Sequence, residues 1–287
     1  MAEVLEGQAP AKVNLVLEVT ARRPDGYHEI DTVLQTLELA DTVRISFGAE
    51  PGVFATGPYA AGTPADESNL AWRAADELAK RCEKPLEGLR IDLEKHIPAA
   101  GGLGGGASDA ATVLQLLGES WGASEDILRE CANAIGSDEA FFLAGGTARA
   151  RGRGERVDRL RPLPPQPVVL LVPETTIERK TGRMFAALDR LPFDDGSVSE
   201  AFACREPGPV HSVEVFNAFE RVAFDLFDGL AATWETLEQR IGQPVRLAGA
   251  GPTLFWIGTS EKLAARAFEA AAGLACRPIL TRTTAPA

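Results

Sequence analysis

The chain has few of the residues that build disulfide frameworks or metal centres. It contains four cysteines and three histidines among 287 residues. Zinc sites and disulfide-rich folds depend on closely spaced cysteine or histidine residues. The cysteines are far apart and form no C-x-x-C pair, so we expect ordinary reduced thiols at Cys82, Cys131, Cys204 and Cys276.

Long apolar runs and an excess of positive charge are also absent from the sequence. No apolar stretch reaches the roughly 18 residues of a membrane-spanning helix, and no basic and apolar leader begins the sequence. The 41 acidic residues outnumber the 29 lysines and arginines, giving a net charge of −12. An extended nucleic-acid surface needs the opposite sign. We therefore expect a cytoplasmic protein without a membrane or nucleic-acid partner, in which a local cationic pocket for a nucleotide is still possible.

The composition leaves room for a substantial hydrophobic core. Hydrophobic residues make up 45% of the chain, which suits one large domain or two smaller ones. The segment "RLRPLPPQP" at 159–167 holds four prolines in nine residues, and neither a helix nor a strand continues readily through it. We place a domain boundary there, with one domain at 1–160 and the other at 161–287.

Hydrophobic periodicity predicts an alternation of strands and helices before this boundary. Period-two patterns indicate a strand over 9–20, two strands within 28–47 that separate near Ala40-Asp41, and a strand within 88–98. The last of these puts Lys95 on the same side as Leu89, Ile91 and Leu93. Helical spacing and serine caps predict three helices, over 69–82 with Ser68 as its cap, 108–118 and 124–136.

The second half reads as another mixture of helices and strands. The same patterns predict a buried strand at 168–173, helices within 178–189, 213–240 and 261–273, two strands joined by a small-residue turn within 245–258, and a strand at 275–281. The fold class is therefore α+β.

The most informative segment is "IPAAGGLGGGASDAA" at 97–111, with five glycines in six positions. It lies between a predicted strand and a predicted helix. Helix N-termini carry unpaired N–H groups and partial positive charge, and glycines let a polyanion approach them without obstruction. A flexible connection is the alternative, but it does not need Ser108 and Asp109 at the helix entrance. The loop is neither a Walker-type phosphate loop nor a dinucleotide fingerprint, because the required lysine and spaced acidic residue are missing.

Three segments in this order resemble the signatures of the GHMP small-molecule kinases. They are "PAKVNL" at 10–15, "PAAGGLGGGASDAA" at 98–111 and "LAGAGPTLF" at 247–255. The segments "RPDGYHEIDTVLQTLELAD" at 23–41 and "ESNLAWRAA" at 67–75 resemble those members of the superfamily that act on a cytidyl-diphosphate sugar alcohol. The resemblance covers essentially the whole chain.

The resemblance implies an architecture and a reaction. The fold would be the two-domain α+β GHMP kinase fold, with a ribosomal-protein-like ATP domain, a ferredoxin-like C-terminal domain and an active site in the cleft between them. The reaction would transfer the γ-phosphoryl group of ATP to a tertiary hydroxyl, with Mg²⁺ as cofactor. The partner would be a small-molecule cytidyl diphosphate, and the protein a monomer or homodimer.

The resemblance also assigns residues to the tasks of phosphoryl transfer, which needs phosphate stabilisation, an aligned acceptor and a base. Asp138 matches the base, and Lys12 would keep Asp138 ionised and offset charge on the acceptor oxygen. The ATP site would comprise Asn69, Leu70, Lys95, Pro98, Gly101, Gly102, Leu103, Gly104, Gly105, Gly106 and Ser108. The substrate site would comprise Asn14, Tyr27, His28, Thr181 and Phe185, with an aromatic face and an imidazole suited to a pyrimidine base.

The chain departs from the usual family pattern in the glycine loop and near Asp138. Ala99 and Ala100 stand where methionine and glycine are usual, Ala107 replaces a serine, and "GSDEAFF" at 136–142 lacks the usual proline after Asp138. Alternatives are a GHMP kinase for another small alcohol, such as a mevalonate-type compound or homoserine, and a nucleotide-binding sensor without activity. An RNA-binding protein is a third, which the acidic charge opposes.

Overall fold

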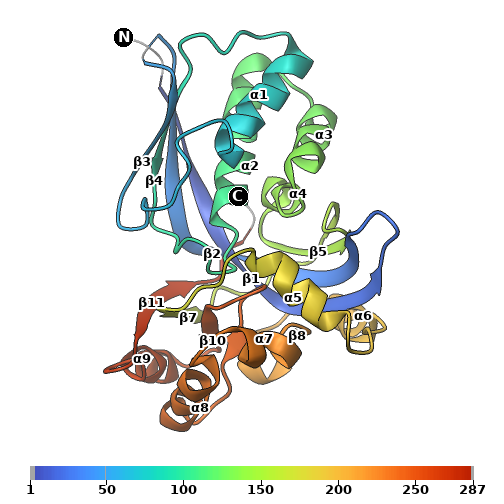
Figure 1. Ribbon diagram of the computed structural model, residues 1–287, viewed down its shortest axis with the longest axis vertical. Coiled ribbons are helices and arrows are strands. Elements are labelled where there is room, and N and C mark those ends of the chain that lie inside the picture. Colours follow the sequence, from blue (N-terminus) through green and yellow to red (C-terminus); the bar gives the residue numbers. More distant parts are fainter. Residues whose placement is uncertain (1–3, 49, 286–287) are drawn as a thin grey trace. The chain divides into compact units, whose positions relative to one another are not determined.

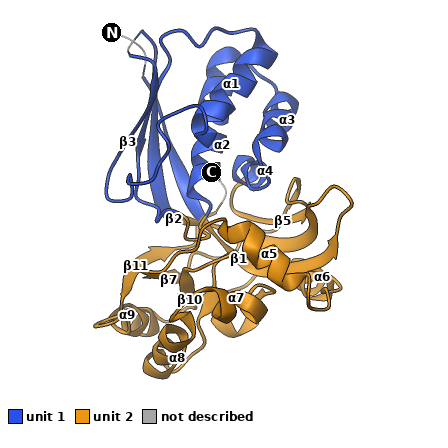
Figure 2. Ribbon diagram, in the orientation of Figure 1, with its two compact units in different colours: residues 1–11, 39–99, 104–144 blue, residues 12–38, 100–103, 145–287 orange. Residues whose placement is uncertain are grey.

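The computed structural model describes residues 4–48 and 50–285, and the chain forms two compact units (Figure 2). Unit 1 comprises residues 1–11, 39–99 and 104–144, and unit 2 comprises residues 12–38, 100–103 and 145–287. Two long strands, β1 (Val4–Arg22) and β2 (His28–Ser46), pass through both units. The division at residue 160 therefore stays a prediction about domain limits, distinct from these contact-based units.

Unit 1 is a small sheet with helices packed on it. Strand β4 (Arg90–Glu94) pairs antiparallel with the end of β2, Thr42 opposite Glu94, and parallel with β3 (Gly52–Thr56). The helices are α1 (Leu70–Cys82), α2 (Gly105–Trp121), α3 (Glu125–Ile135) and α4 (Glu139–Ala144). Figure 1 shows them on one side of this sheet.

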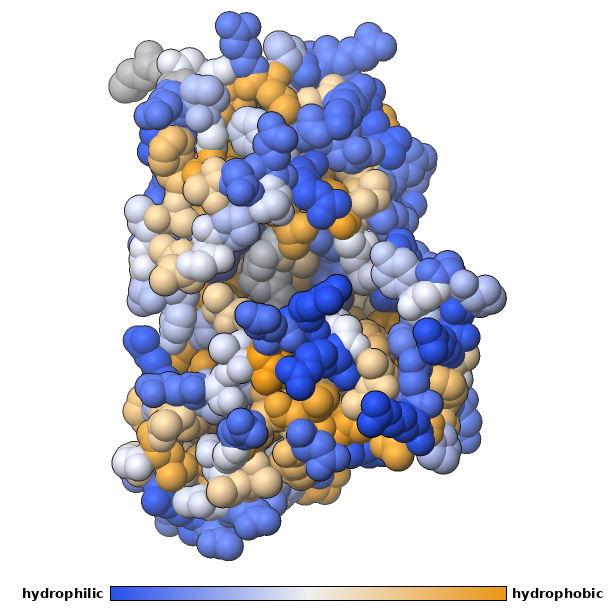
Figure 3. Space-filling view, viewed as in Figure 1, coloured by the Kyte–Doolittle hydropathy of each residue, from blue (hydrophilic) through white to orange (hydrophobic). Residues whose placement is uncertain are grey.

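Small and apolar side chains form the core of unit 1. Helix α1 buries Ala71, Ala74, Ala75 and Leu78, and alanines at a contact let two helix backbones approach closely. Helix α2 buries an apolar stripe against it that includes Val113, Leu114 and Leu117. Figure 3 shows mostly hydrophilic residues over the outer side of α3. The glycine loop, residues 98–104, thus leads into a helix that is anchored in a well-packed core.

Unit 2 contains two groups of strands. The first half of β2 pairs antiparallel with β5 (Thr147–Gly152), which also pairs with β6 (Arg156–Arg159), and β1 pairs parallel with β8 (Phe216–Asn217). The second group is a four-stranded sheet in the order β11-β7-β10-β9. Its strands are β7 (Pro167–Pro173), β9 (Arg246–Leu247), β10 (Leu254–Ile257) and β11 (Cys276–Arg282).

Helices complete unit 2 around an aromatic core. They are α5 (Lys180–Leu188), α6 (Ser197–Cys204), a 3₁₀ turn η1 (Ser212–Glu214), α7 (Glu220–Leu226), α8 (Leu230–Ile241) and α9 (Glu261–Glu269). The core includes Phe219, Phe227, Trp234 and Trp256. The prediction of two strands joined by a turn within 245–258 is confirmed, because β9 and β10 form an antiparallel pair with Leu247 opposite Leu254.

Most strands and the helix after the glycine loop agree with the sequence-based predictions, but three local predictions are wrong. Strand β2 runs through Ala40 and Asp41 without a break, because Asp41 is buried and ion-paired. The cap of α1 is Asn69, whose side chain accepts a hydrogen bond from the N–H of Ala71; Ser68 instead bonds to Asp66.

The third wrong prediction is that residues 213–240 are helical throughout. A short strand, β8, interrupts this region because it pairs with β1. Helix α7 then ends at Leu226, where Phe227 adopts an extended conformation. Gly229, with φ of 74°, is the N-cap from which α8 begins.

Candidate functional site

Three sequence segments far apart in the chain meet in unit 2. Lys12 and Asn14 lie on β1, and the side-chain nitrogen of Lys12 donates to Asn14 Oδ1 at 2.7 Å. The backbone N–H of Lys12 donates to the carbonyl of Leu103, in the glycine loop, at 2.9 Å. Asn14 in turn donates to Thr32 Oγ1 at 2.8 Å. The structure thus brings Lys12, Asn14 and the loop together, as the motifs implied.

The third segment, "LAGAGPTLF" at 247–255, closely approaches the other two at Gly102 and Gly249. A Cβ at Gly102 would lie 2.0 Å from the carbonyl oxygen of Ala248, and one at Gly249 would lie 3.0 Å from Lys12 Nζ. Both residues have positive φ, 87° and 51°. Lys180 also connects the glycine loop to this third segment, because its ammonium donates to the carbonyl of Ala100, at 2.6 Å, and to that of Gly251.

The glycine loop continues into the N-terminus of α2 in unit 1. Gly104 is the N-cap, in the left-handed region. The first helical bond runs from Ser108 N to the Gly104 carbonyl at 2.9 Å, so the N–H groups of residues 105–107 precede the hydrogen-bonded ladder and point out of the helix end. Ser108 Oγ is buried and has no hydrogen-bond partner in the part of the chain that the structure describes. An orphaned buried hydroxyl at a helix start suits a bound phosphate or a cation held by one.

Two of the residues expected in the ATP site lie at the start of α1. The Cδ1 atom of Leu70 is 3.6 Å from the Cβ position of Gly106, so Leu70 faces the first turn of α2. Asn69 uses both side-chain groups locally, since its oxygen caps α1 and its nitrogen donates to the Pro64 carbonyl at 2.7 Å. A contact between Asn69 and adenine stays a prediction.

Lys95 is buried, as the alternation along β4 predicted, but its ammonium has two protein partners. It donates to Asp41 Oδ2 and to Asp109 Oδ2. Burial raises the pKa of Asp109 to about 7; the attraction of Lys95 opposes this shift and the charge of Asp41 adds to it. Neither carboxylate was assigned a role from the sequence, and only the strand alternation indicated that a charge lay inside.

Of the residues expected to hold a pyrimidine, Tyr27 precedes β2 and His28 is its first residue, while Thr181 and Phe185 lie on α5. The rings of His28 and Phe185 are stacked with centroids 4.4 Å apart, and His28 Nε2 lies 2.7 Å from Asp189 Oδ1. Tyr27 is 52% exposed, and the guanidinium of Arg153 lies 4.9 Å from its ring centroid. Thr181 lies in the first turn of α5 and is exposed. Sequence reasoning missed Asp189, because nothing local distinguishes it from a helix-end aspartate.

Asp138 lies between α3 and α4, and its carbonyl accepts the N–H groups of Phe141 and Phe142 at 3.1 and 3.3 Å. The next residue, Glu139, is buried. Burial raises the pKa of Glu139 to about 7, with the charge of Asp138 adding to the shift and a backbone hydrogen bond opposing it. A Cβ at Gly136 would lie 2.5 Å from Glu139 Oε2, so the glycine leaves space for this carboxyl group.

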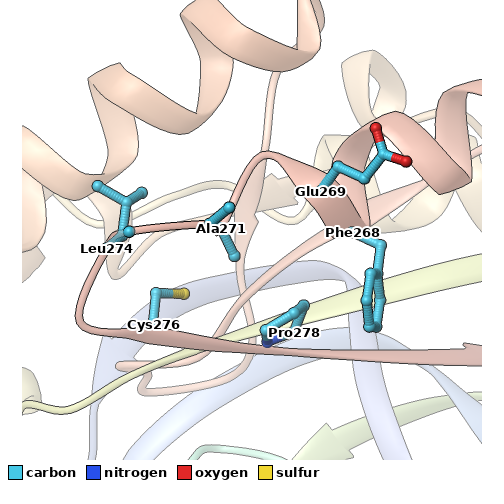
Figure 4. Close-up of a pocket in the computed structure, with 8 residues that line it drawn as sticks. Phe268, Glu269, Ala271, Leu274, Cys276 and Pro278 are labelled. Atoms are coloured by element: carbon cyan, nitrogen blue, oxygen red, sulfur yellow. The ribbon is translucent and has the colours of Figure 1, made fainter.

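A pocket of about 470 Å³ lies elsewhere in unit 2, between the end of α9 and β11 (Figure 4). It is lined mainly by apolar side chains, among them Phe268, Leu274, Cys276 and Pro278. None of the expected site residues is among its described lining. Across the described part of the chain, no helix is long and apolar enough to cross a membrane, and no three histidine, cysteine or acidic residues are grouped to hold a metal ion.

This fold and its converging motifs define a small-molecule kinase. The family model for the GHMP kinases N terminal domain matches residues 69–146. A crystal structure of 4-(cytidine 5'-diphospho)-2C-methyl-D-erythritol kinase is similar with a TM-score of 0.76 and 36% identity, covering 97% of this chain and 98% of the other. Homoserine kinase from Cytophaga hutchinsonii and mevalonate kinase from Methanococcus jannaschii share the fold at 16% and 12% identity, with TM-scores of 0.65 and 0.67.

Curated relatives narrow the assignment. A 4-diphosphocytidyl-2-C-methyl-D-erythritol kinase from Dehalococcoides mccartyi is 40% identical over 266 residues, covering 89% of this chain and 91% of its own length. Another from Shouchella clausii is 35% identical over 288 residues, covering 97% and 96%. The chain therefore belongs to the GHMP kinases and, among them, to the 4-diphosphocytidyl-2-C-methyl-D-erythritol kinase family.

The close approach at Gly102 gives a first prediction. Gly102→Ala would place a methyl group against the Ala248 carbonyl at a positive φ, so we expect it to lower the thermal midpoint and weaken nucleotide binding. Gly62→Ala is the matched control, because Gly62 has a similar positive φ of 83° but a Cβ there would meet none of the described residues within 4 Å. Equal melting curves for the two variants would contradict the packing described here.

The buried Glu139 gives a second prediction, on pH. Its folded pKa of about 7 exceeds the ordinary value of 4.5. Its contribution to the free energy of unfolding is therefore fully present below about pH 4.5 and is lost as pH rises through 7. Glu139→Gln cannot ionise, so the variant does not lose this stability as pH rises. Relative to the native protein, the variant should gain on the order of 1–3 kcal/mol between pH 5 and pH 8, measured by urea unfolding. Glu119→Gln, at an exposed glutamate of α2, is the control, and a pH-independent difference would refute the assignment.

Proposed function

We propose that the protein phosphorylates the C2 hydroxyl of 4-diphosphocytidyl-2-C-methyl-D-erythritol with ATP, a step of non-mevalonate isoprenoid precursor synthesis. The observation that carries this function is sequence identity of 35–40% with kinases of that name over about nine tenths of the chain or more. The meeting of Lys12, Asn14 and the two glycine-rich segments in unit 2 supports it.

The phosphates of ATP are assigned to the glycine loop and the start of α2. The N–H groups that precede the first helical bond offer donors to phosphate oxygens, and the helix end contributes partial positive charge. Ser108 Oγ, buried and without a partner among the described residues, would contact the phosphates or the Mg²⁺ that accompanies them. Mg²⁺, when bound, neutralises charge that develops on the phosphate oxygens.

The acceptor hydroxyl needs a base and a compensating charge. In the transfer, the C2 oxygen bonds to the γ-phosphorus, the bond from that phosphorus to the bridging oxygen breaks, and ADP leaves. We assign the hydroxyl proton to the carboxylate of Asp138 and the offset of negative charge on the acceptor to Lys12. Asn14 holds the Lys12 ammonium by its hydrogen bond at 2.7 Å, and it would orient the sugar alcohol.

The cytosine end of the substrate is assigned to Tyr27, His28, Thr181 and Phe185. The carboxylate of Asp189 faces His28 Nε2 at 2.7 Å, so this nitrogen carries the hydrogen. This contact fixes the orientation of the ring, and we assign recognition of the cytosine edge to the remaining ring nitrogen, Nδ1.

We further propose a cytoplasmic protein that acts as a monomer or homodimer on small phosphorylated molecules, without a nucleic-acid or membrane partner. The small-molecule substrates of the family support this. Light scattering on the purified chain measures the assembly.

The function is tested by ADP release with three acceptors side by side, the cytidyl substrate, mevalonate and homoserine. We expect turnover with the cytidyl substrate alone. Equal or faster turnover with either other acceptor would replace the proposal with another GHMP kinase activity, and ATP binding without any turnover would indicate a sensor.

A third prediction concerns the base. Asp138→Asn keeps the shape of the side chain but cannot accept the proton, so kcat should fall by about 10²–10⁴-fold while KM for the substrate changes little. Asp126→Asn, at an exposed aspartate of α3, is the control. Near-normal turnover in a folded Asp138→Asn protein would remove Asp138 from this role.

A fourth prediction concerns the pyrimidine. Base stacking on an aromatic residue is worth roughly 1–3 kcal/mol, so Tyr27→Ala should lower kcat/KM by about five- to 150-fold. His28→Ala should also reduce the preference for the cytidyl over the uridyl substrate. Kinetics with both substrates and with free methylerythritol measure this. Wild-type activity on free methylerythritol equal to that on the cytidyl substrate would exclude a pyrimidine site.

A further inference from the structure

A buried ion network connects three elements of unit 1. Asp41 on β2, Lys95 after β4 and Asp109 on α2 are 0%, 5% and 2% exposed. The ammonium of Lys95 donates to one oxygen of each carboxylate. We call these three residues the buried network.

The buried network fixes both ends of the glycine loop to the same anchor. Before the loop, Asp41 Oδ1 accepts the backbone N–H groups of His96 at 2.5 Å and Ile97 at 2.8 Å. After the loop, Lys95 bonds to Asp109 in α2. The Cβ position of Gly105 lies 3.2 Å from Ile97 Cγ2 and 3.5 Å from Asp41 Oδ2, so the first residue of α2 rests on this anchor.

Stability alone is a weak reason for such an arrangement. Two carboxylates share one cation in the interior, and the desolvation of buried ions often cancels their attraction. Apolar residues of the same size frequently stabilise a protein as well or better. What ions supply over apolar contacts is directional hydrogen bonding, which holds the attached backbone in one geometry.

We propose that the buried network is a positioning device for nucleotide binding, which holds the end of β4 and the first turns of α2 so that the N–H groups of residues 105–107 are preset for phosphates. The proposal rests on the ATP role of the glycine loop given above. A preset loop has less conformational freedom to lose when the ligand binds. The three residues are thus positioning residues, which act on phosphate through the backbone.

The test removes two of the three charges while keeping the volume. The double variant Lys95→Met/Asp109→Leu replaces two partners with apolar side chains of similar size. Asp41 keeps its charge and the N–H groups of His96 and Ile97 but loses the lysine, so we expect a lower thermal midpoint in a protein that still folds. Its Kd for ATP, measured by calorimetry without acceptor, should rise by about tenfold or more. Asp109→Asn keeps an acceptor for Lys95 and should bind ATP nearly as the native protein does.

Thr112→Val is the matched control, since Thr112 is a buried polar residue of the same helix whose hydroxyl bonds to the Gln8 carbonyl outside the network. It should leave the Kd for ATP unchanged. A Kd in the double variant equal to the native value would overturn the proposal and leave the network a structural feature only.

If the double variant folds poorly, hydrogen exchange of the nucleotide-free protein tests the same proposal. Asp109→Leu alone should speed exchange at residues 96–108 by about tenfold or more while the amides of α3 keep their protection. Uniformly faster exchange throughout unit 1 would overturn the proposal. Native protein that binds ATP but transfers nothing to the cytidyl substrate would refute the proposed function without affecting either measurement.

Discussion

The contact of two backbones at Gly102 is the constraint on which the candidate site in unit 2 depends. The carbonyl oxygen of Ala248 occupies the space where a side chain at position 102 would begin, 2.0 Å from the ideal Cβ. Only because both segments are nearly bare of side chains can the loop after β9 reach the glycine loop and Lys12 together. Glycine therefore does two things in this chain: it leaves backbone donors open to phosphate, and it lets two signatures touch.

Several charged side chains among the candidate residues of each unit are held by protein partners rather than left to solvent. Lys95 lies between Asp41 and Asp109, and Asp189 orients His28. Lys12 bonds to Asn14. In each case a short side chain fixes the direction of a longer or rotatable one, which lowers the freedom that a ligand would have to remove. Orientation, more than net charge, is what this acidic chain provides for anionic substrates.

Sequence patterns predicted the fold where the signal was local and failed where a distant partner decided. The strand that ends near Lys95 and the capped helix at 124–136 were predicted correctly, because both depend on residues that are close together in the sequence. The path of β2 through Asp41 depended on a lysine 54 residues away, and the break at 216–217 on pairing with β1. The candidate site residues were supplied by the resemblance, and their roles stay predictions. Asp189 and Glu139 belong to no such motif, and burial or a long-range contact alone distinguishes them.

The chain passes between its two units five times, since each is assembled from three separate stretches of sequence. On the ribosome this imposes an order. Unit 1 has all its residues once position 144 has emerged. Residues 12–38 of unit 2 are made near the start of synthesis, but the remainder of that unit, beyond residue 145, is made last. β1 therefore finds its neighbour β8 only after some two hundred intervening residues have been made, and closure of so long a loop slows folding. One edge of β1 thus stays unpaired until β8 has been made, although its other edge is hydrogen-bonded to β2, and an unpaired strand edge favours aggregation.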